Sequence, residues 1–94
     1  MINAMIYMRG NPRDFDNWAN LTGDESWKYQ KLLPFFKKFE NYEGNHVNSK
    51  FHGQGGPINI EALRHAPGLD PMLQGAREMG YKVFDLNSYQ REGK

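Results

Sequence analysis

The stretch Met1–Asp16 most constrains what this chain can fold into, because it joins a short apolar run to a well-defined helix start. Asn11 and Pro12 make that start, since asparagine is a favoured N-cap residue and proline is pre-organised for the first helical position. Asn3 is a polar amide among apolar side chains, and a buried amide needs hydrogen-bond partners. The pattern predicts a helix near residues 12–21, preceded by a segment in which Asn3 has a specific partner.

Two more helices are predicted from apolar residues at helical spacing. The second, near residues 29–42, carries leucines and phenylalanines on more than one side, as expected for a helix packed between two layers. It contains Pro34, which predicts a kink or a restart. The third helix, near residues 71–79, has Asp70 as its N-cap and Gly80 as its stop.

One short strand is predicted near residues 57–61, where Ile58 and Ile60 alternate with polar residues. Its edges are expected to be unpaired, because residues 41–50 have the polar composition of a loop. Residues 81–86 are a candidate for a second strand. The predicted fold class is therefore α+β, mostly helical with one or two short strands.

The apolar spacing also predicts which side chains are buried. Trp18 is expected to anchor the core beneath the first helix. The third helix is expected to bury a stripe made of Met72, Leu73, Ala76 and Met79, because methionine at this spacing is usually a core residue.

Lysines interleaved with aromatic residues suggest a nucleic-acid surface, which we weighed against a solvated helix face. Lys31, Lys37 and Lys38 lie among rings of the kind on which single strands stack. The rings follow helical spacing, however, and Glu40 and Glu43 cancel the local charge. A packed aromatic face with a solvated charged face is the favoured interpretation, and no nucleic-acid partner is predicted.

Composition limits the function further. Ninety-four residues suffice for one small domain, and leucine, isoleucine, valine and phenylalanine together make only 19 of them, which predicts a thin core. A net charge of +1 provides no field for capturing nucleic acid or anionic membranes. There is no cysteine, and no apolar run has the length of a membrane span.

Two patterns that resemble binding sites are incomplete. His46, His52 and His65 match no metal-ligand spacing, and no cysteine completes a set, so no metal is predicted. The glycines at 53–56 could cradle a phosphate only if a helix followed directly, whereas Pro57 leads into a strand. A structural turn is predicted there.

The opening stretch resembles a signature of the glucose–methanol–choline (GMC) oxidoreductases, which are FAD-dependent alcohol and sugar dehydrogenases and oxidases. The matching positions are Ile2, Asn3, Tyr7, Gly10 and Asp16. The run Arg9-Gly10-Asn11-Pro12-Arg13-Asp14 is similar to the insect glucose dehydrogenase-like members.

Three further blocks resemble the family in the same order along the chain. The first runs from Trp27 through Leu33-Pro34-Phe35-Phe36 to Lys38, although Lys28 stands where the family usually has a small N-cap residue. The second comprises His52, Gly53, Gly56 and Pro57, and the third Asp85, Asn87, Gln90 and Gly93. The resemblance therefore covers the whole chain.

The resemblance implies a role in hydride transfer from a substrate carbon to FAD. It places Asn3, Ala4, Met5 and Ile6 against the flavin, whereas a purely structural role for Asn3 would be to tie two loops together. It also implies that residues 1–50 belong to an FAD-binding domain and residues 51–94 to the start of a substrate-binding domain, both incomplete. Partners would be a small alcohol or sugar and an electron acceptor.

The resemblance also implies that essential parts of such an enzyme are missing from these 94 residues. There is no Gly-x-Gly-x-x-Gly fingerprint for the ADP half of FAD, no glycine pair before Ile2, and no match to the family's catalytic histidine. We expect an internal fragment of a two-domain FAD-dependent oxidoreductase, without a catalytic residue and inactive alone. The alternative is a stand-alone helical protein-interaction module without catalysis.

Overall fold

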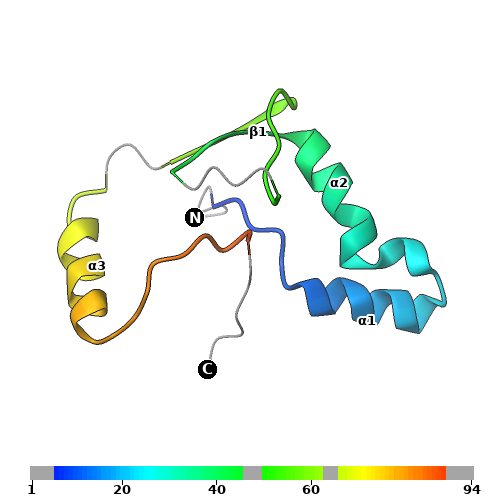
Figure 1. Cartoon of the computed structure of the whole chain (residues 1–94), viewed down its shortest axis with the longest axis horizontal. Helices are drawn as coiled ribbons and strands as arrows, with labels where there is room; N and C mark the ends of the chain where they lie inside the picture. Colours follow the sequence, from blue (N-terminus) through cyan, green and yellow to red (C-terminus); the bar gives the residue numbers. More distant parts are fainter. Residues whose placement is uncertain (1–5, 46–49, 63–65, 89–94) are drawn as a thin grey trace, which may run out of the picture.

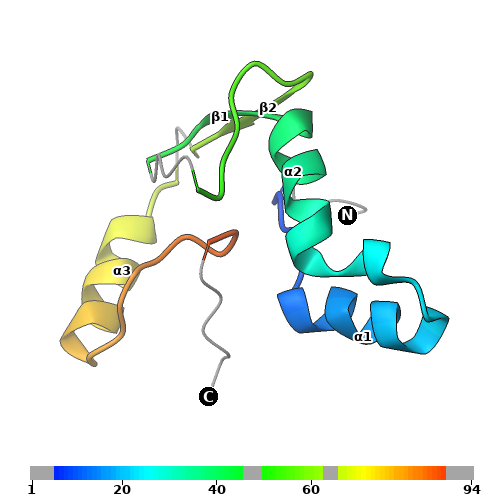
Figure 2. The same cartoon turned by 45° about the vertical axis from the view of Figure 1, so that its right-hand side comes forward.

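The computed structural model describes residues 6–45, 50–62 and 66–88. In chain order, the elements within these ranges are α1 (Pro12–Thr22), the 3-10 helix η1 (Glu25–Trp27), α2 (Tyr29–Phe39), β1 (Glu40–Glu43), β2 (Ile58–Glu61) and α3 (Leu69–Glu78). The helices α1 and α2 lie beyond one end of the two-stranded sheet and α3 beyond the other end, with the segments around residues 6–10 and 85–88 between them (Figures 1 and 2). The fold is α+β, as predicted.

Helix α1 begins and ends where local residue chemistry predicted. The side chain of Asn11 accepts a hydrogen bond from the Arg13 backbone N–H at 3.0 Å, with Pro12 in the first turn. Gly23 follows the helix with φ of 70°, the left-handed conformation that glycine adopts without strain.

The carboxylate of Asp16 in α1 caps the next helix. Lys28 is the N-cap of α2 and makes no side-chain capping bond. Asp16 Oδ1 instead accepts from the Tyr29 backbone N–H at 3.0 Å, which satisfies one of the donors that every helix start leaves free. The acid that closes the opening sequence signature therefore docks α2 onto α1.

Aromatic side chains fill the contact between α1, η1 and α2. Phe15 meets Phe36 edge to face at 5.7 Å between ring centroids, and Ala19 is the buried residue of α1. Trp18 was predicted to be a core anchor, and this prediction is wrong: it packs edge to face against Trp27 but is 46% exposed. A ring at the end of a two-helix contact is covered from one side only.

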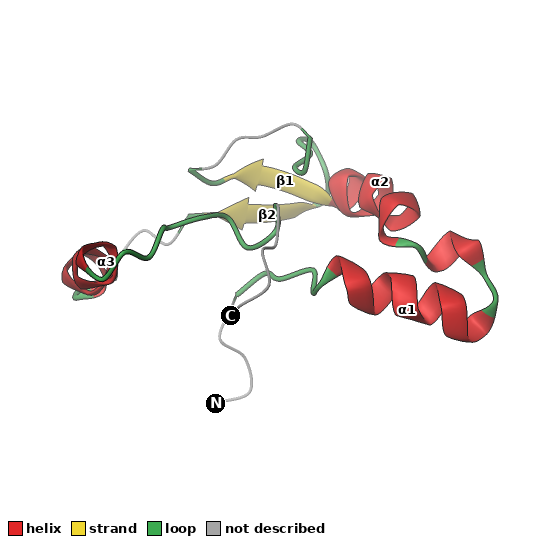
Figure 3. Cartoon of the chain, turned by 60° about the horizontal axis from the view of Figure 1, so that its bottom comes forward, coloured by secondary structure: helices red, strands yellow, loops and turns green. Residues whose placement is uncertain are grey.

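Helix α2 is shorter than predicted and runs straight into a strand. It passes through Pro34 without interruption and ends at Phe39, after which Glu40 is extended at φ −94° and ψ 144° (Figure 3). The prediction of helix to residue 42 and loop from 41 was therefore wrong. The reason is tertiary, because the Glu40 side chain is bound by groups far away in sequence.

Strands β1 and β2 pair in parallel, with Glu40 opposite Ile58 and Glu43 opposite Glu61. The strand near residues 57–61 is thus confirmed, but the expectation of unpaired edges is corrected. Glu40 and Tyr42 are the buried positions of β1, in the alternation that a strand requires.

The loop before β2 lies directly against the junction of α2 and β1. Gly53 donates to Glu40 Oε1 and its carbonyl accepts from Tyr42 N, while the Gly56 N–H donates to the Glu40 carbonyl. A Cβ at Gly53 would lie 2.0 Å from the Lys37 carbonyl oxygen, and one at Gly56 would lie 2.5 Å from the Phe39 carbonyl oxygen. The glycines therefore permit close backbone approach, and the predicted structural turn is confirmed.

Helix α3 stands apart from the other elements (Figure 1). It starts at Leu69 with Gly68 as N-cap, so Asp70 lies inside the first turn instead of capping it. The predicted buried stripe is wrong, since Met72 is 72% exposed and Met79 is also exposed. The candidate strand at residues 81–86 is also wrong, since these residues form no strand in the structure. Helical periodicity identifies the apolar face but not whether a partner covers it.

Candidate functional site

The structure describes only the last of the four residues predicted to contact a flavin. Asn3, Ala4 and Met5 lie outside the described residues. Ile6 is 70% exposed, whereas Arg9, only three positions later, is buried. The predicted contacts therefore remain a prediction, and the structure describes how the chain that follows them is anchored.

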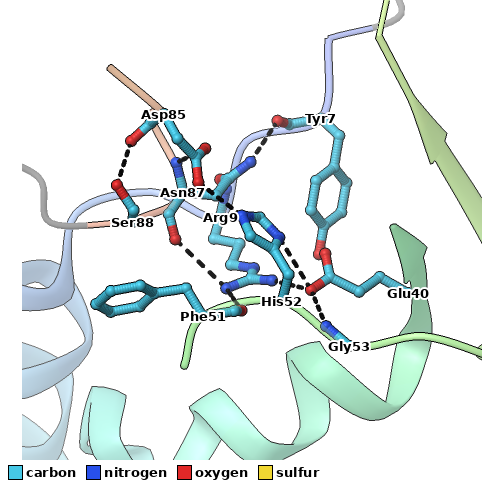
Figure 4. A network of polar contacts seen from close by, with 9 residues as sticks. All are labelled: Tyr7, Arg9, Glu40, Phe51, His52, Gly53, Asp85, Asn87 and Ser88. Carbon is cyan, nitrogen blue, oxygen red and sulfur yellow. Dashed lines mark hydrogen bonds and ion pairs between the residues drawn. The ribbon is translucent and has the colours of Figure 1, made fainter. Parts of the chain in front are cut away.

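Arg9 is the centre of that anchor (Figure 4). Its guanidinium donates to Glu40 Oε1 at 2.5 Å and to the Phe51 carbonyl at 2.7 Å. The Arg9 and Glu40 side chains are 1% and 0% exposed, so the ion pair is fully removed from water. Such a pair is stable only when further hydrogen bonds satisfy both partners.

The surroundings keep Arg9 charged. Burial is the largest influence and by itself lowers the pKa of Arg9, because it disfavours the cation. The effect of burial is outweighed by the side-chain oxygens of three neighbours, Tyr7, Glu40 and Tyr29. The pKa of Arg9 is therefore raised. The Tyr7 hydroxyl acts here through proximity, since it makes no hydrogen bond of acceptable geometry within the described part of the chain.

Glu40 gathers several donors on one oxygen. Its Oε1 accepts from Arg9 Nη2 and from the Gly53 backbone N–H at 2.8 Å, and lies 3.2 Å from His52 Nδ1. The sequence prediction assigned Glu40 to a solvated helix face that cancels lysine charge, and the structure corrects this. Its carboxylate faces inward because the chain turns extended at this residue.

His52 lies between two carboxylates. Its Nδ1 faces Glu40 Oε1, and its Nε2 is 2.6 Å from Asp85 Oδ2. The ring is 4% exposed and stacks on Tyr42 with 3.7 Å between ring centroids. This histidine is therefore held in place on both edges and one face.

Asn87 connects the cluster to the segment that follows the predicted flavin contacts. Its Oδ1 accepts from the Arg9 backbone N–H at 2.9 Å, and its Nδ2 donates to the Tyr7 carbonyl at 3.0 Å. Its own backbone N–H donates to Asp85 Oδ1 at 2.9 Å. The contacts therefore close a ring that passes through Arg9, Glu40, His52, Asp85 and Asn87.

This cluster can hold backbone in place, but its other chemical capacities are restricted. Its charged side chains contact one another, and those of Arg9, Glu40 and His52 are at most 3% exposed, so a substrate has little access to them. Within residues 6–45, 50–62 and 66–88, no group of histidine, aspartate and glutamate side chains has the arrangement of a metal site. Three buried polar atoms lack a hydrogen-bond partner among the described residues, namely Tyr7 Oη, Arg9 Nε and Glu40 Oε2.

Most members of this cluster lie in the family-like blocks of the sequence, but their positions along the chain do not show that they meet. The spacing of His52 excluded a metal site and predicted no other partner for its ring, and the sequence predicted no contact for Arg9. A usable signal was present: an arginine next to Gly10 in an otherwise apolar run needs a buried acid. Which acid it binds cannot be derived from spacing.

Residues 1–94 match the family model of the GMC oxidoreductases. The chain is also 39% identical over 97 aligned residues to the oxygen-dependent choline dehydrogenase of Staphylococcus aureus, in an alignment that covers 98% of this chain. The chain therefore belongs to the GMC oxidoreductase family, whose cofactor is FAD. It spans 16% of the length of that choline dehydrogenase.

Solved structures agree with this assignment. The pyridoxine 4-oxidase from Mesorbium loti superposes with a TM-score of 0.65 at 35% identity, over 84% of this chain and 15% of that one. An FAD-dependent oxidoreductase from Chaetomium thermophilum superposes with a TM-score of 0.75 at 29% identity, over 93% of this chain and 17% of that one. In the part of the chain that the structure describes, no helix is both long and apolar enough for a membrane span.

Proposed function

We propose that this chain provides the flavin-facing segment of an FAD-dependent enzyme that oxidises a CH–OH group of an alcohol or sugar. The observation that carries the proposal is the anchored backbone of residues 7–9, which directly follows the four residues predicted to contact the flavin. A match to the GMC family along residues 1–94 supports it. The activities of the relatives belong to chains much longer than this one, so the substrate class is part of the proposal.

The described residues fit a planar cofactor next to this segment. Ile6 is an apolar side chain exposed to the outside, while the Tyr7 carbonyl and the Arg9 N–H are held by Asn87. A fixed backbone with an open apolar side chain suits contact with a ring system, since the protein must position the cofactor and exclude water. FAD would supply the hydride acceptor for the substrate carbon. Asn3, Ala4, Met5 and Ile6 would hold its ring in place.

The same proposal assigns no catalytic residue to this chain. His52 is the one histidine within the described residues, and its two ring nitrogens face Glu40 and Asp85. A base must be able to reach the proton it removes, and a buried ring held by two carboxylates cannot. We expect these 94 residues to be inactive without the remainder of the family fold, including the base and the ADP-binding fingerprint.

The division into an FAD-binding part at 1–50 and a substrate-binding part at 51–94 is also a proposal. The cluster connects both parts, because Arg9 and Glu40 come from the first while His52, Asp85 and Asn87 come from the second. A joint of this kind suits an enzyme whose cofactor and substrate must meet at a fixed geometry.

The test replaces Asn3 in the protein as its gene encodes it. In Asn3→Leu the flavin or its surrounding loop loses a polar partner at similar side-chain volume, so we expect less bound FAD, an altered visible spectrum or a shifted reduction potential. Tyr7→Phe is the matched control, because it removes one buried hydroxyl that has no hydrogen-bond partner among the described residues. A normal FAD content and a normal reduction potential in Asn3→Leu would show that Asn3 has a purely structural role.

A stand-alone interaction module is the second candidate, favoured by the apolar side chains on the surface of α2 and α3. Phe35 is 66% exposed and Met72 is similarly open. A simple measurement on the purified protein, as its gene encodes it, distinguishes the two candidates. The first predicts bound flavin. The second predicts a colourless protein that associates with a partner through α2 or α3.

A further inference from the structure

We propose that Asn87 is a positioning residue for the flavin, because its side-chain amide holds the backbone that follows the predicted flavin contacts in the way a neighbouring strand would. The step to the flavin rests on the proposed function. The hold on the backbone stands on the contacts of Asn87 alone.

All four polar groups of Asn87 have a partner, and three of them bind Tyr7 or Arg9 (Figure 4). Oδ1 accepts from the Arg9 backbone N–H at 2.9 Å, and Nδ2 donates to the Tyr7 carbonyl at 3.0 Å. The Asn87 carbonyl accepts from Arg9 Nη1 at 3.5 Å, and the Asn87 N–H donates to Asp85 Oδ1. Asn87 is 8% exposed, so these bonds are largely shielded from water.

The two backbone groups that the side chain binds explain why this residue is an asparagine. The Tyr7 carbonyl needs a donor and the Arg9 N–H needs an acceptor, and a primary amide offers both at the spacing of a peptide group. An ionised aspartate offers acceptors only. The same contacts fix the orientation of the amide, because the reversed orientation would set carbonyl against carbonyl and N–H against N–H.

The hold also bears on which side chains of this segment face outward. Ile6 is 70% and Met8 54% exposed, whereas Tyr7 is half-buried and Arg9 is buried. A period of two is typical of extended backbone, in which successive side chains point to opposite sides. Ile6, the last of the predicted flavin contacts, is bonded to Tyr7, whose carbonyl Asn87 binds. Loss of that bond would therefore let the Ile6 side chain shift.

A tight turn presents Asn87 to the segment. Asp85 Oδ1 accepts from the Asn87 N–H at 2.9 Å, and the Asp85 carbonyl accepts from the Ser88 N–H at 3.2 Å and from the Ser88 hydroxyl at 2.7 Å. His52 Nε2 lies 2.6 Å from the other carboxylate oxygen of Asp85. The turn is thus held by its own hydrogen bonds and by His52. A residue fixed in this way can position a cofactor segment without touching the cofactor.

The experiment compares three variants of the protein as its gene encodes it. Asn87→Leu removes both amide groups at similar volume, whereas Asn87→Asp keeps the acceptor for the Arg9 N–H and loses the donor to the Tyr7 carbonyl. Asn59→Leu is the matched control, because Asn59 is exposed and its side chain accepts from Asn41 in the small sheet. Hydrogen exchange at the Arg9 amide, the visible circular dichroism of the flavin and its reduction potential are measured at a temperature where the variants stay folded.

We expect Asn87→Leu to accelerate exchange at the Arg9 amide about tenfold, the usual effect of losing one hydrogen bond, and to change both flavin signals. Asn87→Asp should leave this exchange close to that of the wild type but still change the flavin signals, because the Tyr7 carbonyl then faces a carboxylate oxygen. Asn59→Leu should alter neither. A general loss of stability would not separate the two Asn87 variants in this way.

Unchanged exchange at the Arg9 amide in Asn87→Leu would overturn the hold. Faster exchange in Asn87→Leu, with normal flavin dichroism and potential in both Asn87 variants, would overturn the positioning role and make Asn87 a structural residue. A wild type that binds no flavin would contradict the proposed function instead, and the exchange data would still decide whether Asn87 holds the segment. If Asn87→Leu does not fold, the flavin signals of Asn87→Asp decide the positioning role.

Discussion

Arg9 and Glu40 form an ion pair of 2.5 Å between Nη2 and Oε1, with both side chains almost completely inaccessible to water. They are 31 positions apart, one before α1 and the other after α2. Their contact holds the end of α2 against the segment that precedes α1. His52 then contacts Glu40, and Asn87 contacts Arg9.

Replacing Glu40 should be the most destabilising change in the described chain. Glu40→Gln preserves the shape but leaves the Arg9 cation buried without its counter-charge, which typically costs about 3–5 kcal/mol. Denaturant unfolding would measure the difference. Glu43→Gln is the control on the same strand, where the side chain is exposed and the expected change is within about 0.5 kcal/mol. Equal effects of the two substitutions would refute a buried pair.

Asp16 is expected to stabilise α2 although it belongs to α1. Asp16→Ala removes the acceptor for the Tyr29 N–H and should lower the free energy of unfolding by about 0.5–2 kcal/mol, the usual value of a helix cap. Asp16→Asn keeps an oxygen acceptor and should retain most of the stability. If Asp16→Asn and Asp16→Ala lower the free energy of unfolding equally, the negative charge of Asp16 stabilises α2 and the capping hydrogen bond does not.

Gly53 should tolerate no side chain, for a reason unrelated to its backbone angles. In Gly53→Ala the new Cβ would meet the Lys37 carbonyl, so the end of α2 and the loop must separate and the hydrogen bond to Glu40 is lost. Gly55→Ala is the comparison: its φ of 78° causes strain of about 1–2 kcal/mol, but nothing lies within 4 Å of its Cβ. We expect thermal unfolding to show the larger loss for Gly53→Ala.

Asp24 should give η1 a pH-dependent stability. Hydrogen bonds from Ser26 hold the pKa of Asp24 below its ordinary value. A lowered folded-state pKa means that the ionised carboxylate stabilises the fold above the ordinary pKa, and that this contribution is lost as pH falls through the folded value. Trp27 fluorescence should report the transition, since η1 contains this ring. Asp24→Asn keeps an acceptor and should remove the pH dependence, so an unchanged acid transition in this variant would contradict the assignment.

Local chemistry was sufficient for features whose causes lie within a few residues. Asn11 and Pro12 start α1, Gly23 ends it, and Gly80 follows α3, because caps and left-handed turns depend on neighbouring backbone groups. The family-like blocks were equally readable, since a signature is itself a local pattern. These features sufficed to indicate an α+β chain of the GMC family.

Tertiary structure decided what depends on residues distant in sequence. The end of α2 at Phe39 follows from Glu40, whose carboxylate is taken by Arg9 and by the Gly53 N–H. Helical periodicity cannot contain that information, because the competing partners lie outside the helix. The candidate site was hidden for the same reason: Asn87 meets the Arg9 backbone across 78 positions, and only the folded chain brings them together.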